Sequence, residues 1–219
     1  MGKKSIFTSE QKLIFDKISS SDFFNPGFYF TGGTALSEFY LKHRYSEDLD
    51  FFSEKKFSND QIEMNISKWG KELGFTYSYQ FREVVYIYIL KFKNRVNLKV
   101  DFGYYPYKRI EKGRIEKRMT VDSLFDIAVN KLSAVNERST VKDFVDLYYL
   151  LKKFTLWDLI NGVKVKFGRE LDHWIITADM SFAVKDFNSL PRLIRPLTLI
   201  KLKNFYNNLA VKLGRKAVE

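Results

Sequence analysis

The sequence predicts an α+β protein, in which a mixed β-sheet lobe with flanking helices precedes a helical C-terminal lobe. Three observations support this prediction. Strand-like and helix-like segments alternate up to about residue 74. Residues 75–102 are rich in the aromatic and β-branched side chains that are typical of strands. From residue 120 onward, apolar side chains recur at the spacing of a helix face. This order favours two lobes, 1–118 and 119–219.

The N-terminal region predicts a helix, a strand and a second helix in that order. Thr8 followed by Gln11 resembles a capping box, and an apolar stripe follows it. The aromatic run at 28–31 predicts a short strand that ends at a pair of glycines. Residues 34–41 then have the pattern of a helix.

A second strand and helix follow, and then a block of strands. Residues 48–52 predict a strand, and a helix is expected from about residue 58 to residue 73, where Gly74 ends it. The next block reads as an antiparallel meander with a tight turn between its last two strands. Its expected strands cover residues 75–79, 84–92 and 96–102.

The C-terminal half has helical patterns throughout. Apolar side chains at helix spacing cover residues 124–135 and 144–151. Thr155 with Asp158 marks another helix start, and Pro196 precedes the last helical pattern.

Composition restricts the chemistry available to the chain. It has no cysteine, which excludes disulfides and thiolate metal sites, and its two histidines are too few for a histidine-based zinc cluster. Catalysis must therefore use carboxylates, hydroxyls, lysine or arginine. The 37 basic and 26 acidic side chains give a net charge of +11, which attracts polyanions such as nucleic acid. Scattered lysines that serve solubility are the alternative.

The chain has no apolar segment that suggests a membrane. Residues 1–4 contain no signal core, and no stretch approaches the roughly 18 apolar residues of a membrane span. We therefore expect a cytoplasmic protein.

Three aspartates are candidates for a metal site. Asp48 and Asp50 are two residues apart, so in a strand they project from the same face. Asp101 lies on the polar face of a later predicted strand. Adjacent carboxylates repel unless a cation neutralises them, and hard oxygen ligands select Mg²⁺ or Mn²⁺. Three such carboxylates can hold two metal ions for phosphate chemistry. An exposed strand edge with solvated charges is the alternative.

Gly32 and Gly33 form a turn between a predicted strand and a predicted helix. Glycines at this place let backbone amides approach phosphates. An ordinary tight turn is the alternative. Together with Asp48 and Asp50 on the next strand, the glycine pair forms a more specific pattern than either part alone.

Tyrosines and basic residues alternate between residues 77 and 109. Such a mixture can stack bases and hold phosphates. Aromatic residues are also common in sheets, and that interpretation is favoured for most of these tyrosines. The basic run 109–118 is interpreted as a connector between the lobes, either solvated or in contact with an RNA acceptor.

The segments 32–36 and 44–52 resemble the first motif of AbiEii/AbiGii and MenT-type nucleotidyltransferases, which belong to the DNA polymerase β-like superfamily. The resemblance implies that 1–118 is the catalytic lobe, that an NTP and Mg²⁺ are reactants, and that Asp48 and Asp50 are metal ligands. Gly33 replaces a serine that often contacts phosphate in the superfamily, so that contact falls to backbone amides or nearby hydroxyls. The expected nucleotide-binding residues are Gly32, Gly33, Thr34, Ser37, Arg44, Ser46 and Lys131.

The resemblance continues to about residue 151. Asp101 fits the third carboxylate, and Lys131 fits a helical lysine near the nucleotide phosphates. The run 138–147 resembles the family's R-x(3)-K-D-x-x-D-L motif, which adds Asp143 and Asp146 as catalytic candidates. These two are three residues apart and share a helix face. A helix cap with Thr140 and a surface ion pair are the alternative roles.

The sequence therefore predicts a magnesium-dependent transfer of a nucleoside monophosphate from an NTP to a hydroxyl group. The resemblance makes a tRNA 3′ end the first acceptor to consider and implies a toxin with a cognate antitoxin protein. A protein acceptor, phosphoryl transfer, and a non-catalytic domain that binds nucleic acid or a partner are the alternatives.

Overall fold

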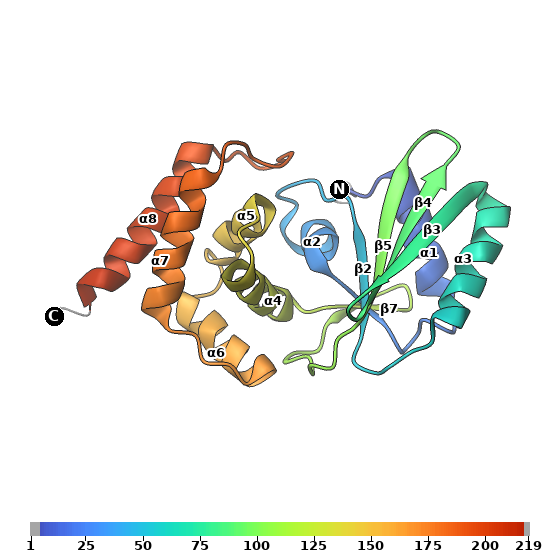
Figure 1. Cartoon of the computed structure of the whole chain (residues 1–219), viewed down its shortest axis with the longest axis horizontal. Helices are drawn as coiled ribbons and strands as arrows, with labels where there is room; N and C mark the ends of the chain where they lie inside the picture. The colour runs from blue at the N-terminus through green and yellow to red at the C-terminus, as the bar shows by residue number, and fades with distance from the viewer. Residues whose placement is uncertain (1–4, 217–219) are drawn as a thin grey trace. The chain divides into compact units, whose positions relative to one another are not determined.

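The computed structural model describes residues 5–216 of the 219-residue chain, so residues 1–4, where no signal core is expected, lie outside the described part. Figure 1 traces the chain, which divides into two compact units. One unit comprises Met1–Tyr40, Ser46–Lys108 and Lys112–Ser123; the other comprises Leu41–Tyr45, Arg109–Glu111 and Leu124–Glu219. Two short segments of the N-terminal half thus group with the helices. The lobes 1–118 and 119–219 stay a prediction.

The first unit contains a mixed seven-stranded sheet with the order β3-β4-β5-β2-β1-β7-β6. Two neighbouring pairs, β2 with β5 and β1 with β7, are parallel, and the others are antiparallel. The expected mixed sheet and antiparallel meander are confirmed. The strands are β1 Tyr29–Thr31, β2 Leu49–Ser53, β3 Phe75–Arg82, β4 Val85–Phe92, β5 Asn97–Tyr104, β6 Arg114–Glu116 and β7 Met119–Val121.

Helices α1 and α3 cover one face of this sheet. The ring of Phe15 on α1 packs against Phe51 of β2, and Phe51 packs against Phe102 of β5. All three rings are buried and form the core of the unit. The predicted capping box starts α1, because the Thr8 hydroxyl accepts from the amide of Gln11. The helical elements here are α1 Ser9–Ser20, α2 Gly32–Ala35, the π-helix η1 Leu36–Leu41 and α3 Asn59–Leu73.

The opposite face of the sheet carries the polar candidates. Side chains alternate along a strand, so the residues next to the buried rings point away from α1 and α3. In register across four strands, Asp50 lies beside Asp101, Asp101 beside Ile87, and Ile87 beside Gln80. We call this side of β2, β5, β4 and β3 the open face.

The second unit is helical. Its α4 packs on α5 and α6, and α7 packs on α8. A Cβ on Gly162 of α6 would lie 2.3 Å from a methyl group of Val129, so this glycine lets α6 approach α4 closely. The predicted capping box of Thr155 and Asp158 is present. The helices are α4 Leu124–Glu137, α5 Val141–Leu150, α6 Leu156–Phe167, α7 His173–Ala183, the 3-10 helix η2 Val184–Asp186 and α8 Leu199–Lys216.

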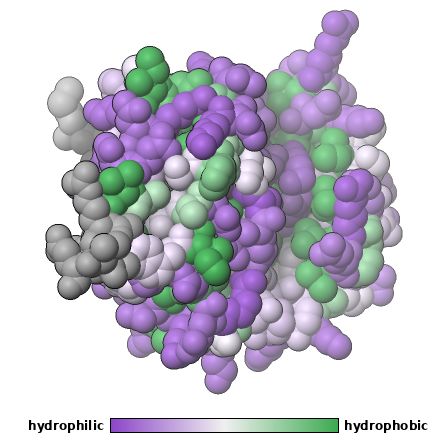
Figure 2. Space-filling model, turned by 60° about the vertical axis from the view of Figure 1, so that its left-hand side comes forward, coloured by the Kyte–Doolittle hydropathy of each residue, from purple (hydrophilic) through white to green (hydrophobic). Residues whose placement is uncertain are grey.

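Apolar side chains are also exposed on the helical unit, among them Ile175 and Phe182 of α7 and Ile200 of α8. Figure 2 shows a face on which hydrophobic patches are separated by hydrophilic side chains. Among the described residues, no helix is long and apolar enough to cross a bilayer.

Two expectations about local structure need correction. The helix expected at 34–41 begins at Gly32 and continues as the π-helix η1. Part of the basic run 109–118, interpreted as a connector, forms strand β6, which pairs with β7 around a turn at Lys117 with φ of 55°. The helical pattern seen from residue 120 therefore starts later, at Leu124, because Thr120 pairs with Tyr29 of β1.

Candidate active site

The structure brings the three candidate aspartates of the sheet together. Asp50 of β2 and Asp101 of β5 are direct neighbours across a parallel strand pair, and both lie on the open face. Adjacent strands are about 4.8 Å apart, so the two carboxylates are side by side. Asp48 lies just before β2 begins at Leu49 and is tied to the same place through Lys99.

Lys99 lies between two of these carboxylates. Its Nζ donates to Asp101 Oδ2 at 2.7 Å and to Asp48 Oδ2 at 3.3 Å. Burial on its own would lower the pKa of Lys99, but the hydrogen bond and charge of Asp101, together with the charges of Asp48 and Asp50, outweigh it and raise that pKa. The lysine is therefore charged and neutralises the carboxylates. The sequence analysis missed this role, although the spacing of Lys99 and Asp101 placed both on one strand face.

The donor set at this place suits a hard divalent cation. Three carboxylates supply oxygen ligands of the kind that Mg²⁺ and Mn²⁺ prefer. Among the residues that the structure describes, however, no three acidic or histidine side chains are close enough to form a metal cluster as they stand. Asp48 and Asp101 instead share the ammonium group of Lys99. A divalent cation at these carboxylates thus requires that Lys99 move aside.

Gly32 places the turn after β1 directly against Asp50. Its φ is +77°, and a Cβ at this residue would lie 2.1 Å from Asp50 Oδ2. Only glycine allows both the backbone conformation and the close approach. Thr31, the residue before it, donates from its hydroxyl to Asp122 Oδ2 at 2.9 Å, which fixes the start of the turn to the end of β7. The strand, turn and carboxylate therefore form one rigid arrangement.

Two hydrogen-bonding side chains hold the segment that contains Asp48. The hydroxyl of Thr34 donates to the backbone carbonyl of Asp48. The amide of Gln11 donates to the carbonyls of Ser46 and Glu47 at 2.8 and 3.0 Å. Thr34 was expected to contact nucleotide and here has a positioning role. Gln11 was singled out only as a helix cap.

The other expected nucleotide ligands of the sheet unit differ in exposure. Ser37, within η1, and Gly33 are buried, whereas Ser46 is half-buried. The backbone of Ser46 is engaged by Gln11. The contacts of these residues with a nucleotide stay predictions.

A buried charge network occupies the helical unit, centred on Asp146 of α5. Its carboxylate accepts from Arg44 Nε at 2.6 Å and Nη2 at 2.8 Å, and it forms an ion pair of 2.6 Å with Lys131 of α4. Burial would raise the pKa of Asp146, but the charges of Lys131 and Arg44 and the hydrogen bonds hold it well below its ordinary value. A bidentate contact between arginine and a carboxylate is among the stronger charge-assisted hydrogen bonds.

His43 joins the same network, and its Nε2 is 2.7 Å from Asp146 Oδ1. An ionised carboxylate only accepts hydrogen bonds, so Nε2 carries a proton. Burial lowers the pKa of His43, against the opposing effect of Asp146. The histidine is thus neutral near pH 7 and acts as a donor to Asp146. No local signal in the sequence indicated this role.

Asp143 completes the network on the same face of α5. Its carboxylate accepts from Lys131 Nζ at 2.6 Å and from Arg138 Nε at 3.0 Å. The Thr140 hydroxyl also donates to it, but the side chain of Thr140, the N-cap residue of α5, makes no capping hydrogen bond to the helix backbone. Four of the predicted residues, Arg44, Lys131, Asp143 and Asp146, are therefore joined in one cluster.

Comparison with known proteins identifies the family. The model of the family described as "Nucleotidyl transferase AbiEii toxin, Type IV TA system" matches residues 14–215. The chain belongs to the AbiEii family. AbiEii proteins are nucleotidyltransferases of type IV toxin–antitoxin systems, so the family implies an NTP substrate and an antitoxin partner. The predicted family and enzyme class are confirmed.

Other known proteins are similar to this chain in sequence or in fold. An uncharacterised protein of Aquifex aeolicus (strain VF5) is 33% identical over 181 residues, which are 79% of this chain and 81% of that protein. A solved structure described as a "putative nucleotidyltransferase from H. pylori" has a TM-score of 0.57 at 18% identity, and the match covers 95% of this chain and 98% of that one. A second structure from Helicobacter pylori has a TM-score of 0.54 at 16% identity, with 96% of each chain covered. At these identities the two structures support the fold alone.

Proposed function

We propose that this AbiEii protein transfers a nucleoside monophosphate from an NTP to a hydroxyl acceptor in a Mg²⁺-dependent reaction. Asp48, Asp50 and Asp101 are the proposed metal ligands. The observation that carries the proposal is the register of the sheet, which sets Asp50 and Asp101 side by side on the open face. The backbone of Gly32 lies against the same carboxylate, where a triphosphate would meet amide groups and not a side chain.

The proposed reaction forms a bond between the acceptor oxygen and the α-phosphorus and breaks the bond from that phosphorus to the β-phosphate oxygen. Pyrophosphate leaves, and the acceptor proton passes to water or to a carboxylate. A divalent cation at this site would neutralise the triphosphate and lower the pKa of the acceptor hydroxyl. The protein's part is to hold the carboxylates in place through Gln11, Thr34 and Gly32.

In the helical unit, Lys131 and Arg44 are the proposed ligands of the nucleotide phosphates. Asp143 and Asp146 orient them through the contacts of 2.6 to 2.8 Å described above. The raised pKa of Lys131, which the two aspartates maintain against burial, keeps it positively charged for this role.

The acceptor that we propose is the 3′ end of a tRNA. The net charge of +11 favours a polyanionic substrate.

The test is incubation of purified protein with each labelled NTP, Mg²⁺ and total tRNA. Wild type is compared with Asp50→Asn and Asp101→Asn, and with Asp22→Asn as a matched control, because the Asp22 side chain is 90% exposed in the same unit. We expect label in tRNA with wild type and the control, and a loss of at least about a hundredfold with each site variant. Label on protein instead of tRNA would move the acceptor to a protein hydroxyl. Equal labelling by all variants would refute the assigned site.

A further inference from the structure

The open face extends from the carboxylates to the edge of the sheet. Across β5, β4 and β3 the register places Asp101 beside Ile87 and Ile87 beside Gln80. A parallel row one step along the strands runs from Lys99 through Ile89 to Ser78. Two strand spacings, about 10 Å, therefore separate the carboxylates from the edge strand β3.

The side chains of these rows are accessible, and they change from aliphatic on β4 to polar on β3. Ile87 and Ile89 are half-buried, so part of each aliphatic side chain is open to solvent. The β3 residues beside them, Ser78 and Gln80, are exposed and polar. A strip of aliphatic surface thus leads from the site to a hydrogen-bonding edge.

The charges of this surface are basic. On the open face, β3 presents Thr76, Ser78, Gln80 and Arg82, and β4 presents Val85, Ile87, Ile89 and Lys91. Both charged residues of these two described strand faces, Arg82 and Lys91, are cationic and exposed. The strip therefore suits a ligand with negative charges at its sides and apolar faces between them.

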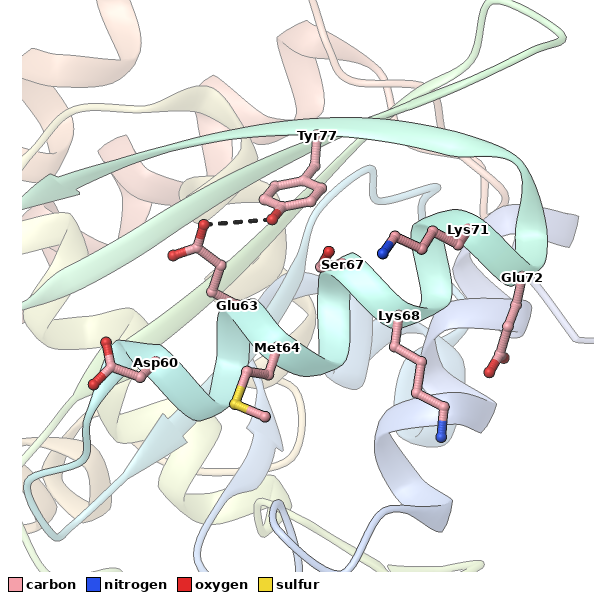
Figure 3. Close-up of a pocket in the computed structure, with 8 residues that line it drawn as sticks. All are labelled: Asp60, Glu63, Met64, Ser67, Lys68, Lys71, Glu72 and Tyr77. Carbon is pink, nitrogen blue, oxygen red and sulfur yellow. Dashed lines mark hydrogen bonds between the residues drawn. The ribbon is translucent and has the colours of Figure 1, made fainter.

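The other side of β3 has a different character. Tyr79 stacks on Tyr88 and Phe81 packs on Tyr86, so the predicted mixture of tyrosines and basic residues is separated onto opposite faces. The pocket beside α3 mixes acidic and basic groups, and Figure 3 shows Tyr77 and Glu63 pointing toward each other across it. Its lining residues are Asp60, Glu63, Met64, Ser67, Lys68, Lys71, Glu72 and Tyr77. Asp60, Glu63 and Glu72 in this mixed lining would repel the phosphates of a polyanion.

We propose that the open face of β3 and β4 binds a single-stranded nucleic acid whose terminal hydroxyl reaches the carboxylates. The inference rests on the proposed function and extends it to the surface that holds the acceptor. Unstacked bases lie on Ile87 and Ile89, and Arg82 and Lys91 neutralise the phosphates. A duplex hides its base faces, so an aliphatic strip selects a single strand.

The test measures binding without catalysis. Fluorescence anisotropy with a labelled single-stranded RNA oligonucleotide of about 12 nucleotides, a length within the site sizes of OB-fold single-strand-binding proteins, is recorded in EDTA. The double variant Arg82→Glu/Lys91→Glu is compared with Lys68→Glu/Lys71→Glu, which makes the same charge change beside α3. We expect the first to weaken binding by about tenfold or more and the second to have a much smaller effect. Ile87→Ser is expected to weaken it about fivefold, because it removes apolar area that a base would bury.

The outcomes separate this inference from the proposed function. Thermal unfolding of each variant first establishes that it is folded. Equal weakening by both charge variants would overturn the open-face assignment, because only the net charge would then matter. If wild type labels tRNA and Arg82→Glu/Lys91→Glu keeps the same KM for tRNA, the function stands and the inference fails. If wild type binds the RNA through this face but labels no acceptor, the inference stands and the function fails.

Discussion

Gly32 has little freedom to change. Replacement by alanine places a Cβ within 2.1 Å of Asp50 Oδ2 and strains a backbone with φ of +77°. Gly168 is a matched control, because its φ is +64° and nothing lies within 4 Å of its virtual Cβ. We expect Gly168→Ala to cost about 1–2 kcal/mol of unfolding free energy and to leave transfer activity intact. Gly32→Ala is expected to lose stability and also to abolish transfer activity. Equal activity in the two variants would contradict this expectation.

Lys99 is the residue whose removal should strengthen metal binding. Lys99→Met takes away the ammonium group that Asp48 and Asp101 share. Without metal, we expect a loss of stability of at most about 1 kcal/mol, because the pair is partly exposed. The affinity for Mn²⁺, measured by calorimetry, is expected to rise several-fold. Lys91→Met on the neighbouring strand should leave it nearly unchanged; an equal rise would indicate a general charge effect.

At the scale of elements, a buried ion pair ties the segment Arg109–Glu111 to α4 and α6. Asp126 Oδ1 is 2.7 Å from Lys166 Nζ, both side chains are fully buried, and Asp126 also accepts from the amides of Ile110 and Glu111. Asp126→Asn leaves a buried ammonium without its charge partner and should cost about 3–5 kcal/mol in urea unfolding. Asp126→Leu/Lys166→Met should recover part of that loss; no recovery would mean that the amide contacts dominate.

His43 makes the stability of the helical unit depend on pH. Its pKa is lowered in the folded protein, so the unfolded chain binds a proton more readily. The free energy of unfolding is therefore undiminished by His43 above the unfolded pKa of about 6.5. It falls as the pH drops below that value, by up to about 1.4 kcal/mol per pH unit. Asp146, Arg44 and Lys131 set this environment.

The variant His43→Gln tests that dependence, because the glutamine amide can donate to Asp146 in place of Nε2 without titrating. Urea unfolding at pH 5.5 and 7.5 should show a smaller difference for the variant than for wild type. The same slope in both proteins would assign the pH dependence to other groups.

The sequence predicted those helix starts and ends that depend on residues close together in the chain. The capping box at Thr8, the helix start at Thr155 and the helix end at Gly74 are present as expected. The three-residue strand β7 was missed, because its place depends on pairing with β1 some 90 residues earlier in the chain. The helix α7 was not singled out either, since its apolar residues lie on more than one side.

The candidate site likewise has features that the sequence predicted and contacts that it could not predict. Strand alternation and the family resemblance grouped Asp50 with Asp101, but the parallel pairing of β2 with β5 that sets them side by side was not predicted. The contacts of Gln11 with Ser46 and of Arg44 with Asp146 join residues 35 and 102 positions apart, and no periodicity or cap encodes such pairs. Family resemblance named Asp146 but gave no partner for it.

At the scale of the whole molecule, the interleaved units predict how the chain responds to truncation. A chain that ends at Ser123 keeps every strand but lacks Asp146, the partner of Arg44 and His43. We expect limited proteolysis to cut this fragment within 41–48 and to spare the full chain there. If the fragment resists cleavage there, the sheet unit alone is enough to order the segment 41–48.

The contact between Arg44 and Asp146 also has a temporal consequence. A ribosome makes Arg44 long before it makes α5, because 102 positions separate the two residues. Until α5 emerges, Arg44 in the segment before Asp48 lacks its partner Asp146. The nascent chain is therefore expected to be inactive. Synthesis of a toxin would then be complete, or nearly so, before its host encounters any activity, which leaves time for an antitoxin translated alongside it to accumulate.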